Sequence, residues 1–233
     1  MTFRPAQNNM QGINNYVPAM QWSASLEMNA CNTFSLGKPA LASATAIGNG
    51  LATNAANGSM VWLPTAWVAD SPYGRPIQLT PSGSVTMTLD VWGEDYLGQP
   101  MVERAAWAAV ATAVVGKKSF YRVLGYKVVA GGGAITVQIG TVGSKLGLPF
   151  KGSIEWAKEG NPPALIDPAT LFSAWTAPDV TDPATALTGD TRGQYTATAA
   201  FDGIKEFIIG LRADNSVNAN DRGGLHGIKQ FAA

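Results

Sequence analysis

The chain has 233 residues, of which 46% are hydrophobic and 14% are charged, and its 16 basic residues balance its 16 acidic ones. A formal charge of zero, without any run of basic residues, argues against a protein that binds nucleic acid or an anionic membrane. Charged residues make up roughly a quarter of an ordinary soluble domain. The low charge therefore favours a surface that contacts neighbouring proteins, with a compact domain whose surface is rich in Ser, Thr, Asn and Gln as the alternative.

The sequence also indicates where the protein is made. Cys31 is the sole cysteine, so no disulfide can form within the chain. The first residues, MTFRPAQNNMQG, lack the apolar core of a signal peptide, and no apolar stretch approaches the roughly 18 residues of a membrane-spanning helix. We expect synthesis and retention in a reducing cytoplasm, from which cell lysis would release the protein.

Residues 1–59 are rich in Asn, Ala, Ser and Gly and show no clear periodicity. Such a composition buries little apolar surface, yet the aromatic residues Tyr16, Trp22 and Phe34 occur within it. We therefore predict an extended, irregular N-terminal arm that packs on the body or on a neighbouring subunit, with these three residues as candidate interface residues. The alternative is a set of loops with one or two strands of the same domain.

Residues 60–233 carry the pattern of short β-strands. Residues 84–92, SVTMTLDVW, alternate apolar and polar side chains, which is typical of a half-buried strand. Residues 100–113 are rich in Ala and would suit a helix, but the flanking pattern favours a strand. Three glycines at 131–133 precede the strand pattern of 134–140 and predict a hairpin.

The second half of the body continues in the same way. Frequent prolines divide it into short strand candidates at 153–157, 171–175, 194–200, 205–212 and 225–231. Short strands separated by turn signals predict a sandwich, jelly roll or barrel. The expected fold is thus all-β, with a β-sandwich or jelly-roll-like body over 60–233 and the arm over 1–59.

The residues for catalysis are sparse. A nucleophile needs a base beside it, and His226 is the only histidine. It has no G-x-S-x-G motif and no partner at metal-ligand spacing, so a structural or surface role is favoured. Cys31 is interpreted as a small apolar side chain. We predict no catalytic residue, no metal and no cofactor.

Four carboxylates, Asp90, Glu94, Asp95 and Glu103, lie close together in the sequence. A pair of carboxylates can cleave glycosides. However, Glu94 and Asp95 lie in a turn with glycines nearby, where Asp is favoured for local hydrogen bonds. Glu103 is expected to pair with Arg122 across strands, so the structural interpretation is preferred.

Three further features also have structural interpretations. The stretch GKKS at 116–119 lacks the upstream glycine of a phosphate-binding loop. The Asn- and Asp-rich residues 214–224 do not have the spacing of an EF-hand and favour a hairpin loop. The seven tryptophans are expected to lie mostly in the core, with a few at contacts.

Several motifs, taken in order, resemble those of a family of tailed-bacteriophage virion structural proteins. They are DVWG at 90–93, GQPMVE at 98–103, GKKSF at 116–120, TVQIGT at 136–141, LGLP at 146–149, TDPATALTGDTRGQY at 181–195, DGIKEF at 202–207 and QF at 230–231. The resemblance covers residues 84–233, whereas the first 60 residues match nothing in this family. None of the motifs carries a catalytic residue of the family.

The resemblance implies a non-enzymatic protein of the bacteriophage particle, made in the host cytoplasm. The first hypothesis is a capsid decoration (cement) protein that binds and stabilises the outer shell. Its partners would be the major capsid protein and copies of itself in a homo-oligomer, without nucleic acid, membrane or cofactor. The alternatives are a head-to-tail connector or tail component, and then a receptor-binding or glycan-binding module.

Overall fold

A computed structural model describes residues 31–54, 58–167, 175–179, 181, 184–213 and 230. All regular elements within these ranges are β-strands, which confirms the expected all-β fold. The described part of the chain contains no helix that could span a membrane.

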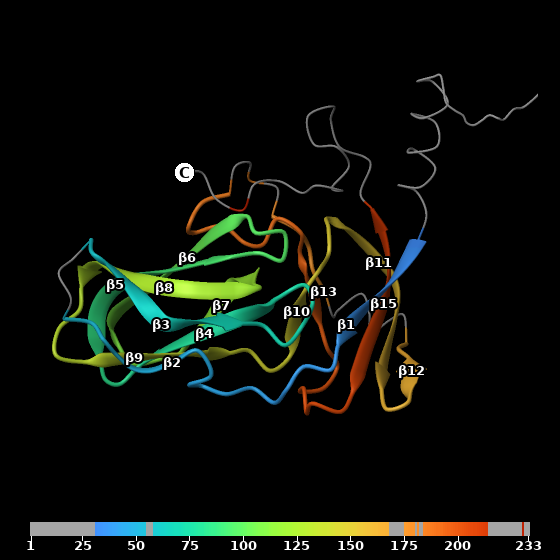
Figure 1. Ribbon diagram of the computed structural model, residues 1–233, viewed down its shortest axis with the longest axis horizontal. Coiled ribbons are helices and arrows are strands. Elements are labelled where there is room, and N and C mark those ends of the chain that lie inside the picture. Colours follow the sequence, from blue (N-terminus) through green and yellow to red (C-terminus); the bar gives the residue numbers. More distant parts are fainter. Residues whose placement is uncertain are drawn as a thin grey trace, which may run out of the picture.

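Two four-stranded antiparallel sheets form a sandwich in one half of the molecule (Figure 1). One sheet has the order β3-β8-β5-β6, with β3 at Met60–Val68, β5 at Val85–Glu94, β6 at Pro100–Val110 and β8 at Arg122–Gly131. The other has the order β2-β9-β4-β7, with β2 at Gly48–Ala52, β4 at Arg75–Pro81, β7 at Val114–Phe120 and β9 at Thr136–Thr141. The two sheets enclose a core of aliphatic and aromatic side chains that includes Ile77, Leu79, Leu89, Phe120, Val128 and Ile139.

Strand β5 shows why the sequence forms this sandwich. Val85, Met87, Leu89 and Val91 are all buried, while Thr86 between them is exposed. Alternate residues of a strand point to opposite faces, so every second side chain enters the core. The strand predicted over 84–92 is thus confirmed, and the Ala-rich residues 100–110 form its partner strand β6 rather than a helix.

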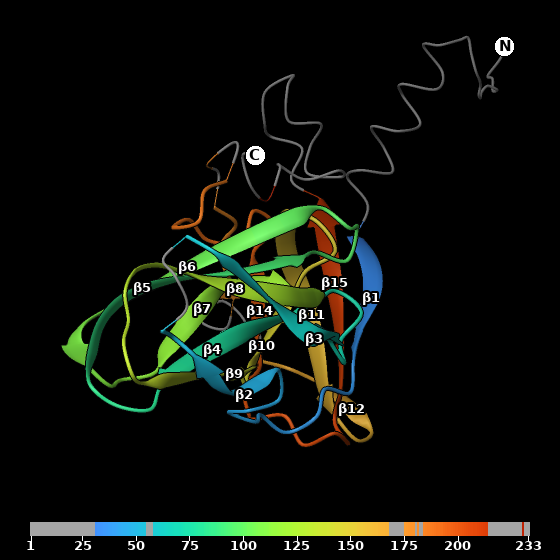
Figure 2. The same ribbon diagram turned by 60° about the vertical axis from the view of Figure 1, so that its left-hand side comes forward.

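The other half of the molecule has two further sheets (Figures 1 and 2). One has the order β1-β15-β11-β12, with β1 at Cys31–Gly37, β11 at Gly152–Gly160, β12 at Pro163–Leu165 and β15 at Glu206–Ala213. The other has the order β10-β14-β13, with β10 at Lys145–Gly147, β13 at Trp175–Thr176 and β14 at Gln194–Thr196. Between them lies a second apolar core that includes Leu36, Leu146, Tyr195, Phe207 and Ile209.

Arg75 connects the two halves, although its side chain is only 1% exposed. It forms an ion pair with Asp70 at 2.8 Å and donates a hydrogen bond to the Val142 carbonyl at 2.8 Å. Its guanidinium also lies over the ring of Phe201, which belongs to the second core. A buried arginine needs such partners because an unpaired buried charge is costly. The pairing therefore fixes how the sandwich meets the second core.

Residues 31–54, which the sequence placed in the arm, lie within the body. Strand β1 pairs with β15, and β2 pairs with β9. This arrangement matches the alternative of one or two strands of the same domain. The first 30 residues of the predicted arm, with Tyr16 and Trp22, lie outside the described residues.

The three glycines at 131–133 do not close the predicted hairpin. Strand β8 before them belongs to one sheet of the sandwich, and β9 after them belongs to the facing sheet. All three glycines have positive φ angles, of 72°, 90° and 147°, which only glycine adopts readily. They therefore turn the chain from one sheet into the other instead of pairing two neighbouring strands.

Candidate functional site

Three of the sequence motifs meet at one place, where the sandwich contacts the second half of the molecule. Residues 90–103 form the second half of β5, the first four residues of β6 and the turn between them, and residues 116–120 form the end of β7. The described residues of 181–195 form a loop that runs past β7 into β14. A network of buried charged side chains connects the three motifs.

Asp190 is the central acceptor of this network and is 3% exposed. Its carboxylate accepts hydrogen bonds from the backbone N–H of Ser119 at 2.8 Å and from Nε of Arg192 at 3.2 Å. It also accepts one from the Gln230 amide at 3.2 Å. Asp190 therefore connects β7, its own loop and the carboxy-terminal QF motif.

Arg192 is buried beside two carboxylates. Besides its bonds to Asp190, its guanidinium lies 3.9 Å from Asp95 and over the ring of Tyr96. Burial alone lowers the pKa of Arg192, but Asp190 and Asp95 outweigh this effect and raise the pKa above its usual value. Arg192 is thus held as a cation inside the protein.

Asp95 is the turn residue that the sequence predicted. One of its carboxylate oxygens accepts hydrogen bonds from the backbone N–H groups of Leu97 and Gln99, both at 2.8 Å. This is the local turn bonding for which Asp is favoured. Burial raises the pKa of Asp95, against the opposing effects of Arg192 and these N–H groups.

Glu103 is held by the backbone of β7. Its carboxylate accepts hydrogen bonds from the backbone N–H groups of Lys117 and of Lys118, the latter at 3.3 Å. Burial raises its pKa to about 7, although both N–H groups and the Lys118 ammonium oppose the rise. The neighbouring Gly116 explains the glycine of the GKKSF motif, because a Cβ there would overlap the Glu103 carboxylate.

Lys117 and Lys118 point to opposite sides of β7. Lys118 is fully buried, and its ammonium donates hydrogen bonds to the carbonyls of Thr185 and Thr188, both at 2.7 Å. Burial lowers its pKa, against the opposing charges of Glu103 and Asp190. Both lysines lie within strand β7.

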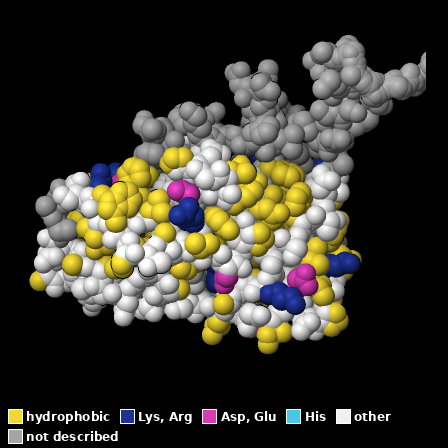
Figure 3. Space-filling model, in the orientation of Figure 1, with side chains coloured by type: hydrophobic (Ala, Val, Ile, Leu, Met, Phe, Trp, Pro, Cys, Tyr) yellow, Lys and Arg dark blue, Asp and Glu magenta, His cyan; other side chains and the backbone are white. Residues whose placement is uncertain are grey.

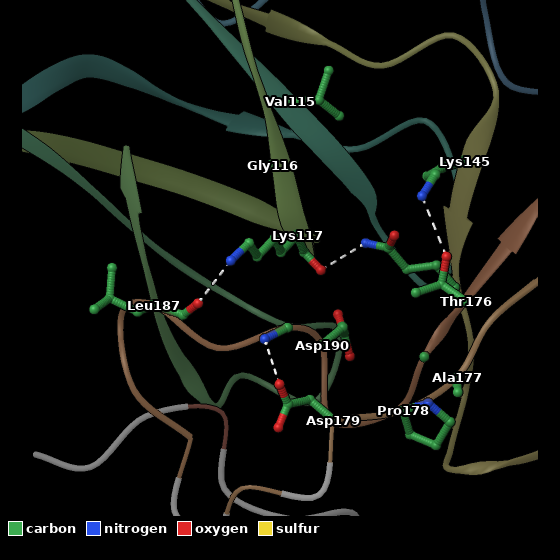
Figure 4. A pocket seen from close by; sticks show the side chains of 13 residues that line it. Val115, Gly116, Lys117, Lys145, Thr176, Ala177, Pro178, Asp179, Leu187 and Asp190 are labelled. Carbon is green, nitrogen blue, oxygen red and sulfur yellow. Dashed lines mark hydrogen bonds between the residues drawn. The ribbon is translucent and has the colours of Figure 1, made fainter. Parts of the chain in front are cut away.

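A pocket of about 480 Å³ lies beside the buried network, between β7 and the loops before β14 (Figure 4). Lys117 at its edge donates to the Leu187 carbonyl at 3.1 Å, and Lys145 donates to the Thr176 hydroxyl at 3.2 Å. Asp179 accepts from the Gly189 N–H at 2.9 Å. These three charged side chains are thus bonded to neighbouring parts of the chain, and they do not form a pair of nucleophile and base.

The four carboxylates noted in the sequence are dispersed rather than paired with each other. Asp90 binds Arg104 through two hydrogen bonds of 2.6 and 2.7 Å. Glu94 lies 3.4 Å from Arg122, so the expected Glu103–Arg122 pair is wrong because the β5–β8 register places Arg122 opposite Glu94.

The remaining candidates from the sequence fall in three places. Phe34 is half-buried in β1, where its ring packs edge-on against Tyr73 and Phe150 at the second core. Tyr16, Trp22, His226 and the loop of 214–224 lie outside the described residues. Cys31 is exposed at the start of β1 rather than acting as an apolar core side chain.

Sequence reasoning did not find Asp190 and Arg192 as partners, although it found the motif that contains them. Their separation by one residue, Thr191, is a usable signal, since a carboxylate can accept from the backbone N–H two residues later, as Asp190 does at 2.9 Å.

Comparisons with protein-family models, with curated proteins and with solved structures find no match to this chain.

Proposed function

We propose that this chain is a structural, non-enzymatic protein of a bacteriophage particle. The observation that carries the proposal is the use of the motif side chains. Asp90, Asp95, Glu103 and Asp190 are all buried, and each carboxylate accepts hydrogen bonds from other residues of the same chain. Because the polar groups of these motifs bond within the chain, they stabilise the fold. Contacts with partners would then be made by other residues on the surface.

Within that class, the proposal is a capsid decoration protein that binds the outer shell, with the major capsid protein and copies of itself as partners. The weak charge of the chain supports such contacts, as do the large apolar side chains on its surface, which include Trp62, Leu165 and Leu187. Figure 3 shows yellow hydrophobic side chains at several places on one face, with few charged groups among them. A protein that binds the mature shell but not its immature form stabilises the mature form by mass action.

The test is the copy number of this chain in purified particles of the phage that encodes it, measured by quantitative mass spectrometry against the major capsid protein. A count in the hundreds is expected for a protein of the shell. A count of about a dozen or fewer, as in a closed ring, would instead favour a connector or tail component. Absence from the particle would overturn the structural proposal.

The strand boundaries determine which amino-terminal deletion tests the proposal. Removing residues 1–59 would delete β1 and β2, and with them the buried Leu36 of the second core. Removing residues 1–30 leaves both strands in place. A decoration protein that binds through its amino-terminal segment is expected to lose shell binding on this shorter deletion and to retain its thermal unfolding transition.

The glycan-processing alternative has a direct test as well. Glu103 is 4% exposed and accepts bonds from two backbone N–H groups, so it is poorly placed to reach a sugar. We expect no turnover of host polysaccharide by the full chain. Turnover that is lost in Glu103→Gln would support an enzyme and contradict the proposal.

A further inference from the structure

An apolar groove runs along the edge of the sandwich, between β3 and the segment that precedes β2. It consists of two adjoining hollows of about 480 and 210 Å³, which share Ala46, Trp67 and Val68. We call this surface the β3 groove. It is formed by Leu41, Ile47, Leu63, Pro64, Trp67 and Val68.

The β3 groove is apolar and partly open to solvent. Leu41 is 68% exposed and Val68 is 51% exposed. Ile47, Leu63 and Trp67 are half-buried and pack against the core of the sandwich, so the floor of the groove continues that core. Covering this surface would remove apolar area from water, at roughly 25 cal/mol for each Å².

The backbone of β3 favours contacts through side chains in the groove. Strand β3 is at the edge of its sheet, and its pairing with β8 is interrupted between Trp62 and Trp67. Pro64 lies in this interrupted stretch and has no N–H to offer to an added strand. The occupant is therefore expected to insert side chains rather than to extend the sheet.

The chain itself contains a segment of matching chemistry. Residues 16–22, YVPAMQW, include six apolar or aromatic side chains and no charge. Residues 1–30 as a whole contain only two charged side chains, Arg4 and Glu27. Two charged residues, Asp70 and Arg75, line the smaller hollow of the groove, and they form an ion pair with each other. The pocket beside β7 is a poorer match, because four charged residues, Lys117, Lys145, Asp179 and Asp190, line it.

The length of the chain permits the segment to reach the groove of its own copy. One end of the groove lies at Asp70, which accepts a hydrogen bond from the Ala40 N–H at 2.7 Å, shortly after β1 ends at Gly37. Strand β1 spans about 20 Å from Cys31 to Gly37. The eight residues between Trp22 and Cys31 allow a span of up to about 30 Å when extended. Trp22 can thus return along β1 to this end of the groove.

We propose that residues 16–22 pack into the β3 groove of their own chain. Tyr16 and Trp22 would then supply aromatic side chains to the surface formed by Leu41, Trp67 and Val68. This inference is independent of the proposed role in a phage particle, because it depends only on the groove and on the composition and length of the amino-terminal segment.

The first test is photo-crosslinking in the full chain, with p-benzoyl-phenylalanine in place of Leu41. Residues 16–22 of the same chain are the expected product, recovered at the mass of one copy. Crosslinks to a second copy, to another protein, or to none of residues 16–22 would overturn the proposal. The same probe in place of Leu187, which is 60% exposed and lies at the other pocket, should not capture residues 16–22.

The second test compares two valines of nearly equal exposure by hydrogen–deuterium exchange. Val68→Glu places a charge in the β3 groove, whereas Val115→Glu places one on β7, outside it; the wild-type side chains are 51% and 50% exposed. Exchange of the amides of residues 16–22 should be at least about tenfold faster in Val68→Glu than in the wild type and unchanged in Val115→Glu. Unprotected amides in the wild type, or equal exchange in both variants, would contradict the proposal.

Discussion

The carboxylate of Asp190 accepts a hydrogen bond of 2.8 Å from the backbone N–H of Ser119, across 71 residues of sequence. The two residues belong to two different motifs, and both are buried. A loop residue thus satisfies the backbone of a strand of the sandwich. Since a charged acceptor forms stronger hydrogen bonds than a neutral one, this contact fixes the loop of 184–193 on β7.

Replacing Asp190 by Asn is expected to destabilise the protein strongly. The substitution keeps the shape of the side chain but leaves the buried Arg192 with Asp95, at 3.9 Å, as its nearest carboxylate partner among the described residues. Removing one partner of a buried ion pair costs about 3–5 kcal/mol, which corresponds to a fall in melting temperature of about 10 °C for a chain of this length. Differential scanning calorimetry at neutral pH measures it.

The matched control is Asp202→Asn, which also removes one aspartate charge from an ion pair. Asp202 lies on the surface with Lys205 and accepts bonds from the backbone N–H groups of Ile204 and Lys205, which an Asn side chain can retain in part. Its melting temperature should remain close to that of the wild type. Equal losses in the two variants would mean that the buried network has no special role in stability.

A second prediction concerns the two adjacent lysines of β7. Lys118→Met should free the loop of 184–190, because the carbonyls of Thr185 and Thr188 each lose the ammonium donor. A hydrogen bond from a charged donor contributes about 1.5–3 kcal/mol to stability. Hydrogen–deuterium exchange should show faster exchange in residues 184–190.

Lys117→Met is the control for this experiment, since the Lys117 side chain is exposed and its ammonium makes one hydrogen bond to the described part of the loop, to the Leu187 carbonyl at 3.1 Å. Exchange in the loop should change little in this variant. Faster exchange in Lys117→Met than in Lys118→Met would show that the exposed lysine, and not the buried one, holds the loop.

The sequence predicts the centre of the sandwich well because its strands have one buried face. Strand β5 alternates apolar and polar residues, with Met87 and Leu89 buried on the side of the core. This periodicity can be read directly from the sequence. Strand β1 is different: four of its seven residues are exposed, and only Leu36 is fully buried. Phe34 and Leu36 are the two large apolar side chains of this strand, and two positions are too few for a clear periodic signal, so the sequence places β1 in the arm.

The buried network was harder to predict for another reason. Asp190 and Lys118 are charged residues in segments that resemble loops or exposed strands, and the pattern of neighbouring residues does not indicate that they are buried. Their burial depends on partners more than 60 residues away, such as Ser119 for Asp190 and Thr185 for Lys118. The sequence located the motifs, and the register of β7 against the loop determines what their side chains do.

A third prediction tests the glycine of the DVWG motif. Gly93 lies in β5, and a Cβ at this position would collide with the carbonyl oxygen of Arg122 on β8. Gly93→Ala must therefore separate two paired strands, and overpacking of this kind costs about 1–3 kcal/mol. Gly83→Ala is the control, because a Cβ there meets no atom within 4 Å. Urea unfolding should show a loss of stability for Gly93→Ala only, and equal midpoints would refute the steric explanation.

A fourth prediction concerns pH and follows from Glu103. Burial raises the pKa of this carboxyl from its ordinary 4.5 to about 7. Between these two values the folded protein keeps a proton that the unfolded chain has released. The free energy of unfolding therefore contains a contribution that is fully present below pH 4.5, decreases as the pH rises through 7, and amounts to about 3 kcal/mol.

Glu103→Gln removes this titration. From pH 4.5 to pH 8, the unfolding free energy of the wild type should therefore fall by about 3 kcal/mol relative to that of the variant. Glu155→Gln serves as a control of opposite sign. The hydrogen bond from Arg212 lowers the pKa of Glu155, so its contribution is present above pH 4.5 and is lost as the pH falls further. A wild-type-to-Glu103→Gln difference that stays constant from pH 4.5 to 8 would mean that Glu103 is ionised in the folded protein throughout this range, held so by the N–H groups of Lys117 and Lys118.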